Sequence, residues 1–327
     1  MKPLIDLHRH LDGAVTADIA KGLADLQKIA LPTDRDAELE RLLTVPGDCR
    51  SLNDFLACFA LPVSLMQTRE GLSEAAYRVA EDMRAEGICY GELRCAPQLH
   101  TARGMTQRDA VLAVLDGLRR SPLKTNLILC FMRGEGNDAA NLETLAVAKE
   151  LLVEDGGVVA LDLAGAEALF PTDRYRELFA RAKAAGIPFT IHAGEADGAE
   201  SVRLAVEYGA RRIGHGVRAR EDEAVTRLLL EKGIFLEMCP TSNRQTQAVA
   251  DMAAYPFMDY LNRGLGVTLN TDDPAIEGTT LEKEYRYMEE HFGLTEAQEK
   301  QLLENAIDAA FTSDAVRADL RRLCRIS

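Results

Sequence analysis

Short apolar runs alternate with longer amphipathic stretches along most of the chain. The runs are rich in Val, Ile, Leu and Cys and show little alternation, which is typical of strands covered on both faces. Glycines that suit a left-handed helix cap, such as Gly87 and Gly209, follow several of the stretches. The predicted strands are Leu4–His8, Ile88–Arg94, Asn126–Met132, Val158–Leu163, Pro188–His192, Arg212–His215, Ile234–Cys239 and Val267–Thr271.

Helical periodicity fills most of the gaps between these strands. An alternation of strand and helix repeated eight times predicts an α/β fold, a (β/α)8 TIM barrel. We therefore expect residues 1–327 to form a single domain. The predicted helices are Ser73–Glu86, Thr106–Arg120, Ala139–Glu154, Asp173–Ala185, Ala199–Tyr208, Asp222–Glu231 and Asp251–Asn262.

One insertion interrupts the alternation, because about 80 residues separate the first strand from the second. Within it, Ser51–Leu65 is predicted to be helical, with Leu52, Phe55, Leu56 and Phe59 on one side. An insertion after a barrel strand lies on the active-site face, so residues of about 34–70 are interpreted as a lid. The alternative is that they only pack on the barrel wall. The charged tail, Leu294–Ser327, is predicted to form one or two packing helices.

Charge and cysteine content narrow the function classes. The chain has 38 basic and 52 acidic residues and a net charge of −14, which argues against a nucleic-acid or anionic-membrane partner and favours a small ligand. Seven scattered cysteines without a Cys-x-x-Cys pair indicate a reduced, cytoplasmic protein. Because only seven residues precede His8 and no long apolar run exists, we expect neither a signal peptide nor a membrane span. Oligomeric state is unknown from sequence.

Polar motifs follow five of the predicted strands. Residues two apart on a strand point to the same side, so the imidazoles of His8 and His10 face one point. Active sites of barrels lie at the carboxyl ends of the strands, where all these motifs fall. The other two histidines, His100 and His291, do not belong to a polar motif at the end of a predicted strand and are expected at the surface. The motifs are His8-x-His10, Gly165, His192-Ala-Gly-Glu195, Gly214-His215-Gly216 and Asn270-Thr-Asp272-Asp273-Pro274.

These residue types fit a catalytic zinc site. A tetrahedral catalytic zinc takes three or four protein ligands and keeps a position open for water. His8, His10, His192 and Asp272 supply three nitrogens and one oxygen, which predicts one zinc per chain. Three groups then remain for acid–base chemistry: Glu195, His215 and Asp273.

The ordered set of motifs resembles the adenosine deaminase family of the amidohydrolase superfamily over nearly the whole chain. The resemblance lies in His8-Arg-His-Leu-Asp-Gly13, Asp162-Leu-Ala-Gly165, His192-Ala-Gly-Glu195, Ile213-Gly-His-Gly216, Thr241-Ser-Asn243 and Asn270-Thr-Asp-Asp-Pro274. Phe55-Leu-Ala-Cys-Phe59 is similar to the family's hydrophobic gate. One departure is Ala166, where the family often has an aspartate, so any role of a carboxylate there is in doubt.

The resemblance implies a role for each motif residue. Zinc would be held by His8, His10, His192 and Asp272. Glu195 would give a proton to the purine ring, and His215 and Asp273 would surround the attacking water. Asp12 would meet the ribose 5′-hydroxyl and Gly165 would contact the purine through its backbone, while His10 and Asp273 would also lie against the substrate.

The expected chemistry follows from the same groups. Zinc lowers the pKa of a water molecule toward about 7. Asp273 or His215 would take the proton and direct the oxygen to C6 of the purine. Glu195, kept protonated by a raised pKa, would protonate N1, and ammonia would leave. Adenosine and 2′-deoxyadenosine would give inosine and 2′-deoxyinosine.

Other hydrolases fit less well. A binuclear amidohydrolase would need a bridging lysine after the fourth strand, and Asp162–Gly165 contains none. The other zinc deaminase architecture carries Pro-Cys-x-x-Cys, which is absent here. A binding protein on this scaffold would be expected to lose a ligand or the acid.

Alternatives within the family stay open: adenine, or another adenosine derivative such as aminodeoxyfutalosine. Adenine deaminases tend, by resemblance, to carry Glu where Asp12 stands. A nucleotide would want a cation for its phosphate, and the Asp12 carboxylate would repel it.

Overall fold

Eight parallel strands form the centre of the molecule in a computed structural model that describes residues 3–47, 49 and 51–326. Each predicted strand is present, with ends that differ by about two residues or fewer. The strands are β1 Leu4–His10, β2 Ile88–Cys95, β3 Lys124–Met132, β4 Val158–Ala164, β5 Thr190–Ala193, β6 Arg212–His215, β7 Phe235–Met238 and β8 Gly266–Leu269.

The strands close into a barrel. They form two four-stranded sheets, in the orders β1-β2-β3-β4 and β5-β6-β7-β8. Parallel bridges join the sheets at both seams, from Leu161 to Phe189 and from Arg9 to Asp272. At the second seam, His10 N donates to the Asp272 carbonyl at 2.9 Å and Asp272 N to the His8 carbonyl at 2.8 Å. The predicted (β/α)8 barrel is confirmed.

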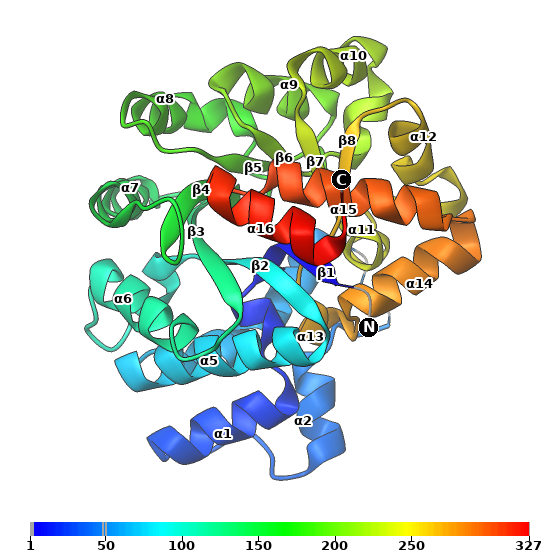
Figure 1. The fold of residues 1–327 in the computed structure, drawn as a ribbon. Helices are drawn as coiled ribbons and strands as arrows, with labels where there is room; N and C mark the ends of the chain where they lie inside the picture. Colours follow the sequence, from blue (N-terminus) through cyan, green and yellow to red (C-terminus); the bar gives the residue numbers. More distant parts are fainter. Residues whose placement is uncertain (1–2, 48, 50, 327) are drawn as a thin grey trace.

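Helices cover the outside of the barrel as a ring (Figure 1). The helix predicted over Asp251–Asn262 is divided: a 3₁₀ turn at Met252–Ala254 comes first, and the α-helix begins at Phe257, because Pro256 has no N–H to continue a helix through it. The helices of the ring are α5 Arg69–Ala85, α6 Gln107–Leu118, α7 Asp138–Leu151, α8 Arg176–Ala184, α9 Ala199–Tyr208, α10 Glu223–Lys232 and α12 Phe257–Asn262. Short helices α11 Pro240–Gln245 and α13 Pro274–Glu277 follow β7 and β8.

The long insertion follows β1, as predicted. It begins with α1 Ala17–Gln27 and α2 Asp36–Leu43. The single helix expected over Ser51–Leu65 is divided into α3 Leu52–Leu56, a 3₁₀ turn at Ala57–Phe59 and α4 Ala60–Leu65. Pro62 accounts for the division, since it cannot donate to the carbonyl one turn before it. Asp48 and Arg50 of the predicted lid lie outside the described residues.

The C-terminal helices close the amino end of the barrel. Helices α14 Leu281–Phe292, α15 Glu296–Ala309 and α16 Asp314–Cys324 follow the last strand, and α15 and α16 cross the near end of the ring in Figure 1. Ile307 and Leu320 pack there against Ile5 and Leu7 of β1. The tail therefore packs as predicted, and the opposite end of the barrel, where the motifs lie, is left to the insertion.

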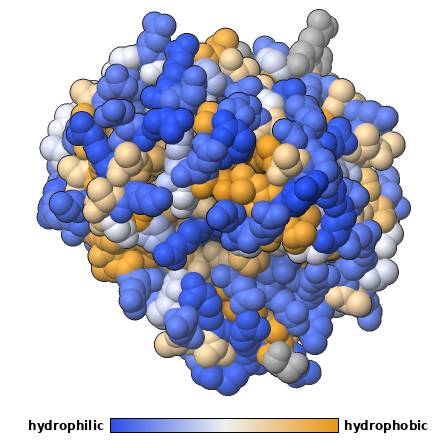
Figure 2. Space-filling model, turned by 90° about the horizontal axis from the view of Figure 1, so that it is seen from above, coloured by the Kyte–Doolittle hydropathy of each residue, from blue (hydrophilic) through white to orange (hydrophobic). Residues whose placement is uncertain are grey.

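Most of the face seen from above is hydrophilic, with smaller hydrophobic areas between the polar side chains (Figure 2). The large exposed hydrophobic residues come from separate segments, such as Leu169 after β4 and Leu323 in α16. None of the helices in the described part of the chain has the length and hydrophobicity needed to cross a bilayer.

Candidate active site

Five motif side chains converge at the carboxyl ends of the strands. The Nε2 atoms of His8 and His10 lie 3.0 and 3.3 Å from Asp272 Oδ1, and the Nε2 atoms of His10 and His192 lie 3.3 Å apart. His215 faces the same point, with Nε2 3.7 Å from Asp272 Oδ2. Asp272 and His215 have left-handed backbone angles, φ 77° and 63°, which residues with a side chain rarely adopt. Such strain is held where the surrounding structure fixes a site.

Buried carboxylates orient two of the imidazoles from behind. His8 Nδ1 donates to Glu237 at 2.7 Å, and His192 Nδ1 donates to Asp162 at 2.9 Å. Arg94 joins the two carboxylates with bonds of 2.8 Å to each. Burial raises the pKa of Asp162, but the charges of His192 and Arg94 outweigh it and hold that pKa well below its ordinary value. With Nδ1 protonated, the Nε2 lone pairs of His8 and His192 face the point of convergence.

His215 has the opposite tautomer. The Asn243 amide nitrogen donates to His215 Nδ1 at 3.0 Å, and Tyr255 donates its hydroxyl to the Asn243 amide oxygen at 3.0 Å, which fixes the amide's orientation. The proton of His215 is therefore on Nε2, 3.6 Å from Glu195 Oε2. Burial lowers the pKa of His215 to about 3, so the ring stays neutral. It offers an N–H rather than a lone pair.

The convergent group fits a metal ion. One potential ligand atom from each of His8, His192, His215 and Asp272 lies within 4.8 Å of the others. His8 Nε2 is fully buried and makes no hydrogen bond, and the atom that it faces at 3.0 Å is Asp272 Oδ1, as expected for two ligand atoms directed at one cation. Distance alone thus includes His215 in the group, whereas its tautomer favours His10 as the fourth ligand. Burial holds the pKa of His10 well below its ordinary value, which keeps this imidazole neutral.

Carboxyl groups with raised pKa values surround this point. Burial raises the pKa of Glu195 to about 8, and the charge of Asp272 adds to the effect. Burial and Asp272 also raise the pKa of Asp273, whose Oδ1 is buried without a hydrogen-bond partner. Asp12 lies 7% exposed, with its pKa raised to about 6 by burial. Raised pKa values bring these carboxyl groups closer to neutrality, where a side chain can exchange a proton as general acid–base catalysis requires.

A cavity of about 380 Å³ opens onto these groups. One wall comes from the insertion, because Leu52, Phe55, Leu56 and Phe59 all line it, and the lid interpretation stays a prediction. A small polar floor under apolar walls is typical of sites for small molecules. Besides the apolar side chains, the lining includes Gly165 and the polar residues His10, Asp12, His192, Glu195, His215, Ser242, Asp272 and Asp273.

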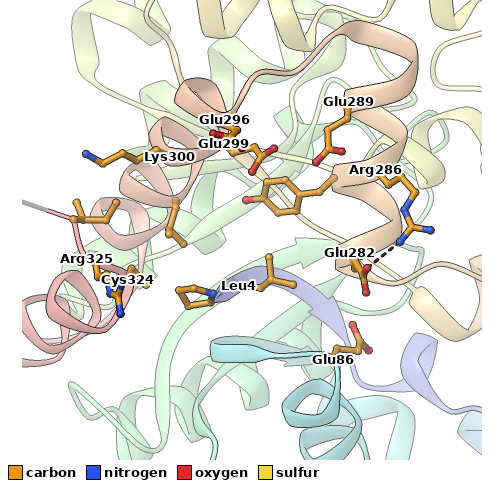
Figure 3. Close-up of a pocket in the computed structure, with 14 residues that line it drawn as sticks. Leu4, Glu86, Glu282, Arg286, Glu289, Glu296, Glu299, Lys300, Cys324 and Arg325 are labelled. Atoms are coloured by element: carbon orange, nitrogen blue, oxygen red, sulfur yellow. Dashed lines mark hydrogen bonds and ion pairs between the residues drawn. The ribbon is translucent and has the colours of Figure 1, made fainter. Parts of the chain in front are cut away.

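A second hollow, the amino-end hollow, lies beside the start of β1 and has a volume of about 540 Å³ (Figure 3). Side chains from α14, α15 and the chain end surround it, among them Glu282, Arg286, Lys300 and Arg325. All the residues predicted for the site belong to the other end of the barrel. The amino-end hollow is larger than the cavity at the carboxyl end but is lined by none of the convergent site residues.

Several residues of the site were missed by the sequence analysis. Arg94 and Glu237 are charged residues within apolar strands, and that contrast was an available signal, since such side chains must point into the barrel. Glu167 is buried beside Ala166 and binds the backbone after β5. The expectation for His100 was wrong: it is 1% exposed at the end of a 3₁₀ turn, where Nδ1 bonds to the Met66 carbonyl at 3.1 Å. The segment that contains Met66 covers His100, and local sequence patterns do not indicate a contact between residues 34 positions apart. His291 is exposed, as expected.

Solved structures with similar folds include several deaminases. An adenine deaminase from Arthrobacter aurescens superposes with a TM-score of 0.88 at 28% identity, covering 99% of this chain and 98% of that one. An N6-methyl-AMP deaminase from Arabidopsis thaliana gives 0.83 at 27% identity, covering 99% and 96%. An amidohydrolase from Burkholderia ambifaria with bound Zn gives 0.86 at 25% identity, covering 99% and 90%.

Sequence comparisons are more specific. An adenosine deaminase from Haemophilus ducreyi is 48% identical over 317 residues, covering 95% of this chain and 92% of that protein. One from Enterococcus faecalis is 39% identical over 315 residues, with the same coverage. The family model described as adenosine deaminase matches residues 3–325. Site geometry, fold and sequence agree, and the chain belongs to the adenosine deaminase family.

Proposed function

We propose that this protein is a zinc-dependent hydrolase that converts adenosine and 2′-deoxyadenosine to inosine and 2′-deoxyinosine with release of ammonia. The observation that carries the proposal is the position of Glu195, a buried carboxyl group with its pKa raised to about 8 beside the convergent histidines. The 48% identity to an adenosine deaminase supports the substrate.

One zinc ion per chain would be held by His8, His10, His192 and Asp272. When bound, it supplies a Lewis acid that makes water acidic near neutral pH. The lone pairs that Glu237 and Asp162 direct inward suit such an ion. The Zn in the related amidohydrolase supports the choice of metal.

Glu195 is proposed to activate the purine. A C6 carbon is a poor electrophile until N1 carries a proton, and a carboxyl group that stays protonated at neutral pH can deliver it. Burial is the main cause of the raised pKa of Glu195, and apolar residues of the insertion line the cavity onto which Glu195 opens. Glu195 would then hold N1–H while the C6 centre becomes tetrahedral.

Asp273 and His215 are proposed to direct the water. Because the Nε2 of His215 already carries a proton, this ring can donate a hydrogen bond but cannot accept a proton there. The acceptor would be Asp273, whose Oδ1 is buried without a hydrogen-bond partner and is therefore free to bond to the water. His215 would orient the attacking oxygen.

The cavity favours a nucleoside over a nucleotide. No Lys or Arg is among the described residues that line it, and its buried carboxylate, Asp12, would repel a phosphate. Asp12 is proposed to bind the ribose 5′-hydroxyl, and the Gly165 backbone to contact the purine. One solved relative is an adenine deaminase, so free adenine is included among the substrates to be tested. A cytoplasmic location remains a prediction.

A substrate screen tests the proposal. Purified protein would be assayed for ammonia release from adenosine, 2′-deoxyadenosine, adenine, AMP and N6-substituted adenosines. The two nucleosides should be turned over with the highest kcat/KM. Preferential turnover of adenine, or of AMP, would contradict the proposal.

A further inference from the structure

The loop that follows β5 is bound along its length by one buried side chain, Glu167. Its Oε2 accepts hydrogen bonds from the backbone N–H groups of Glu195, Ala196 and Asp197 at 3.0, 2.7 and 3.1 Å. Its Oε1 accepts from Gly194 N at 2.8 Å and from the Ser201 hydroxyl at 2.6 Å. Four consecutive backbone N–H groups therefore point at a single carboxylate. Glu195, the proposed acid, is one of the four residues.

The carboxylate is well suited to fix this loop. Glu167 is fully buried, so these bonds are not exchanged for bonds to water. Successive N–H groups form a concave anion site, and charge-assisted bonds to it are stronger than neutral ones. Gly194, with φ 69°, allows the turn that presents the N–H groups. On the strand side, Arg133 donates to the His192 carbonyl at 2.6 Å.

We infer that Glu167 is a positioning residue for the reaction: it fixes the backbone of Gly194 to Asp197 and so holds the Glu195 carboxyl group against the purine. The inference rests on the proposed role of Glu195. Glu167 would touch neither substrate nor metal, because its oxygens are occupied by the loop. Arg133, through its bond to the His192 carbonyl, fixes the end of β5, where this loop begins.

Positioning has a measurable consequence. A displacement of a reacting group by about 1 Å can lower the rate by roughly 100-fold. In Glu167→Gln, one amide oxygen must serve donors that now use two oxygens, and the NH2 group faces N–H groups. We expect kcat for adenosine to fall roughly 10- to 100-fold, with KM within about threefold and zinc content unchanged.

A matched control separates positioning from general destabilisation. Asn126 is also buried and also holds a loop, accepting from Gly156 N at 2.7 Å, but it lies at the amino end of β3. Asn126→Ala should lower the melting temperature while kcat, measured well below it, stays within about threefold of wild type. Glu167→Gln should lose kcat at the same temperature while fully folded.

A double-mutant cycle tests whether Glu167 acts through Glu195. Added to Glu195→Gln, the Glu167→Gln change should reduce kcat by less than about threefold, because residues that act as a unit are not additive. An equal loss on both backgrounds, or wild-type kcat for Glu167→Gln beside an inactive Glu195→Gln, would overturn the inference alone. A fully active Glu195→Gln would instead overturn the proposed acid, and the inference with it.

Discussion

The hollows at the two ends of the barrel differ in how deeply their charged side chains are buried. At the carboxyl end, charged and titratable groups are buried around a cavity of about 380 Å³, and carboxylates such as Asp162 and Glu237 bond to imidazoles. Around the larger amino-end hollow, most charged side chains stay in contact with water: Glu282 and Arg286 pair at 2.9 Å with side chains 66% and 60% exposed, and the exception is Glu86, 18% exposed, which pairs with the buried Arg9.

The difference shows that volume does not locate a site. Burying a charge costs free energy unless it is paired or coordinates a metal, so a cluster of buried charges indicates a purpose. Exposed pairs contribute little and need no such explanation. Four predictions test this contrast, beginning at the carboxyl end, where substitutions should have the largest effects on activity.

The largest effect is expected at the metal ligands. Asp272→Ala and His192→Ala should each lose zinc, and kcat should fall by at least about 1,000-fold, since a metal supplies several kcal/mol of transition-state stabilisation. Metal analysis and ammonia release measure both. An Asp272→Ala protein with full zinc and more than a tenth of wild-type kcat would remove this residue from the ligand set.

Glu195→Gln should leave the metal and remove the acid. The amide can still donate a hydrogen bond to N1 but cannot transfer a proton, so kcat should fall by roughly 10²–10⁴-fold while KM changes only a few fold. Steady-state kinetics on protein of verified zinc content decides this. If kcat stays above about a tenth of wild type, another group supplies the proton.

Asp12→Ala tests substrate choice. A buried hydrogen bond to a charged group contributes about 1.5–3 kcal/mol, so KM for adenosine should rise by roughly 10- to 150-fold without loss of zinc. The same variant assayed with adenine is the control, because a base without ribose cannot use this contact. An unchanged KM for adenosine would point to adenine deamination instead.

The smallest effect is expected at the amino-end hollow. Glu282→Gln removes one charge of an exposed pair, so the free energy of unfolding should change by about 0.5 kcal/mol or less. Denaturant unfolding and kcat together check this. A large fall in kcat would mean that this end of the barrel takes part in the reaction.

Sequence patterns predicted the barrel well because each strand is a short, apolar run between helices. The motif residues were located for the same reason: His8, His192 and Asp272 lie at strand ends, and the ends of parallel strands meet. Local sequence patterns do not indicate which side chains pair with one another across the barrel. The contacts of Arg94 with Asp162 and Glu237 join segments far apart in the chain, and the burial of His100 depends on a neighbouring segment.

The most direct test of the account is the dependence of activity on bound zinc. Protein stripped with a chelator would receive zinc in steps, with bound metal and ammonia release from adenosine measured at each step. Activity should be lost on stripping, rise in proportion to bound zinc and level off at about one zinc per chain. Full activity without metal, or a rise that continues to two metals per chain, would contradict a single zinc at the carboxyl end of the barrel.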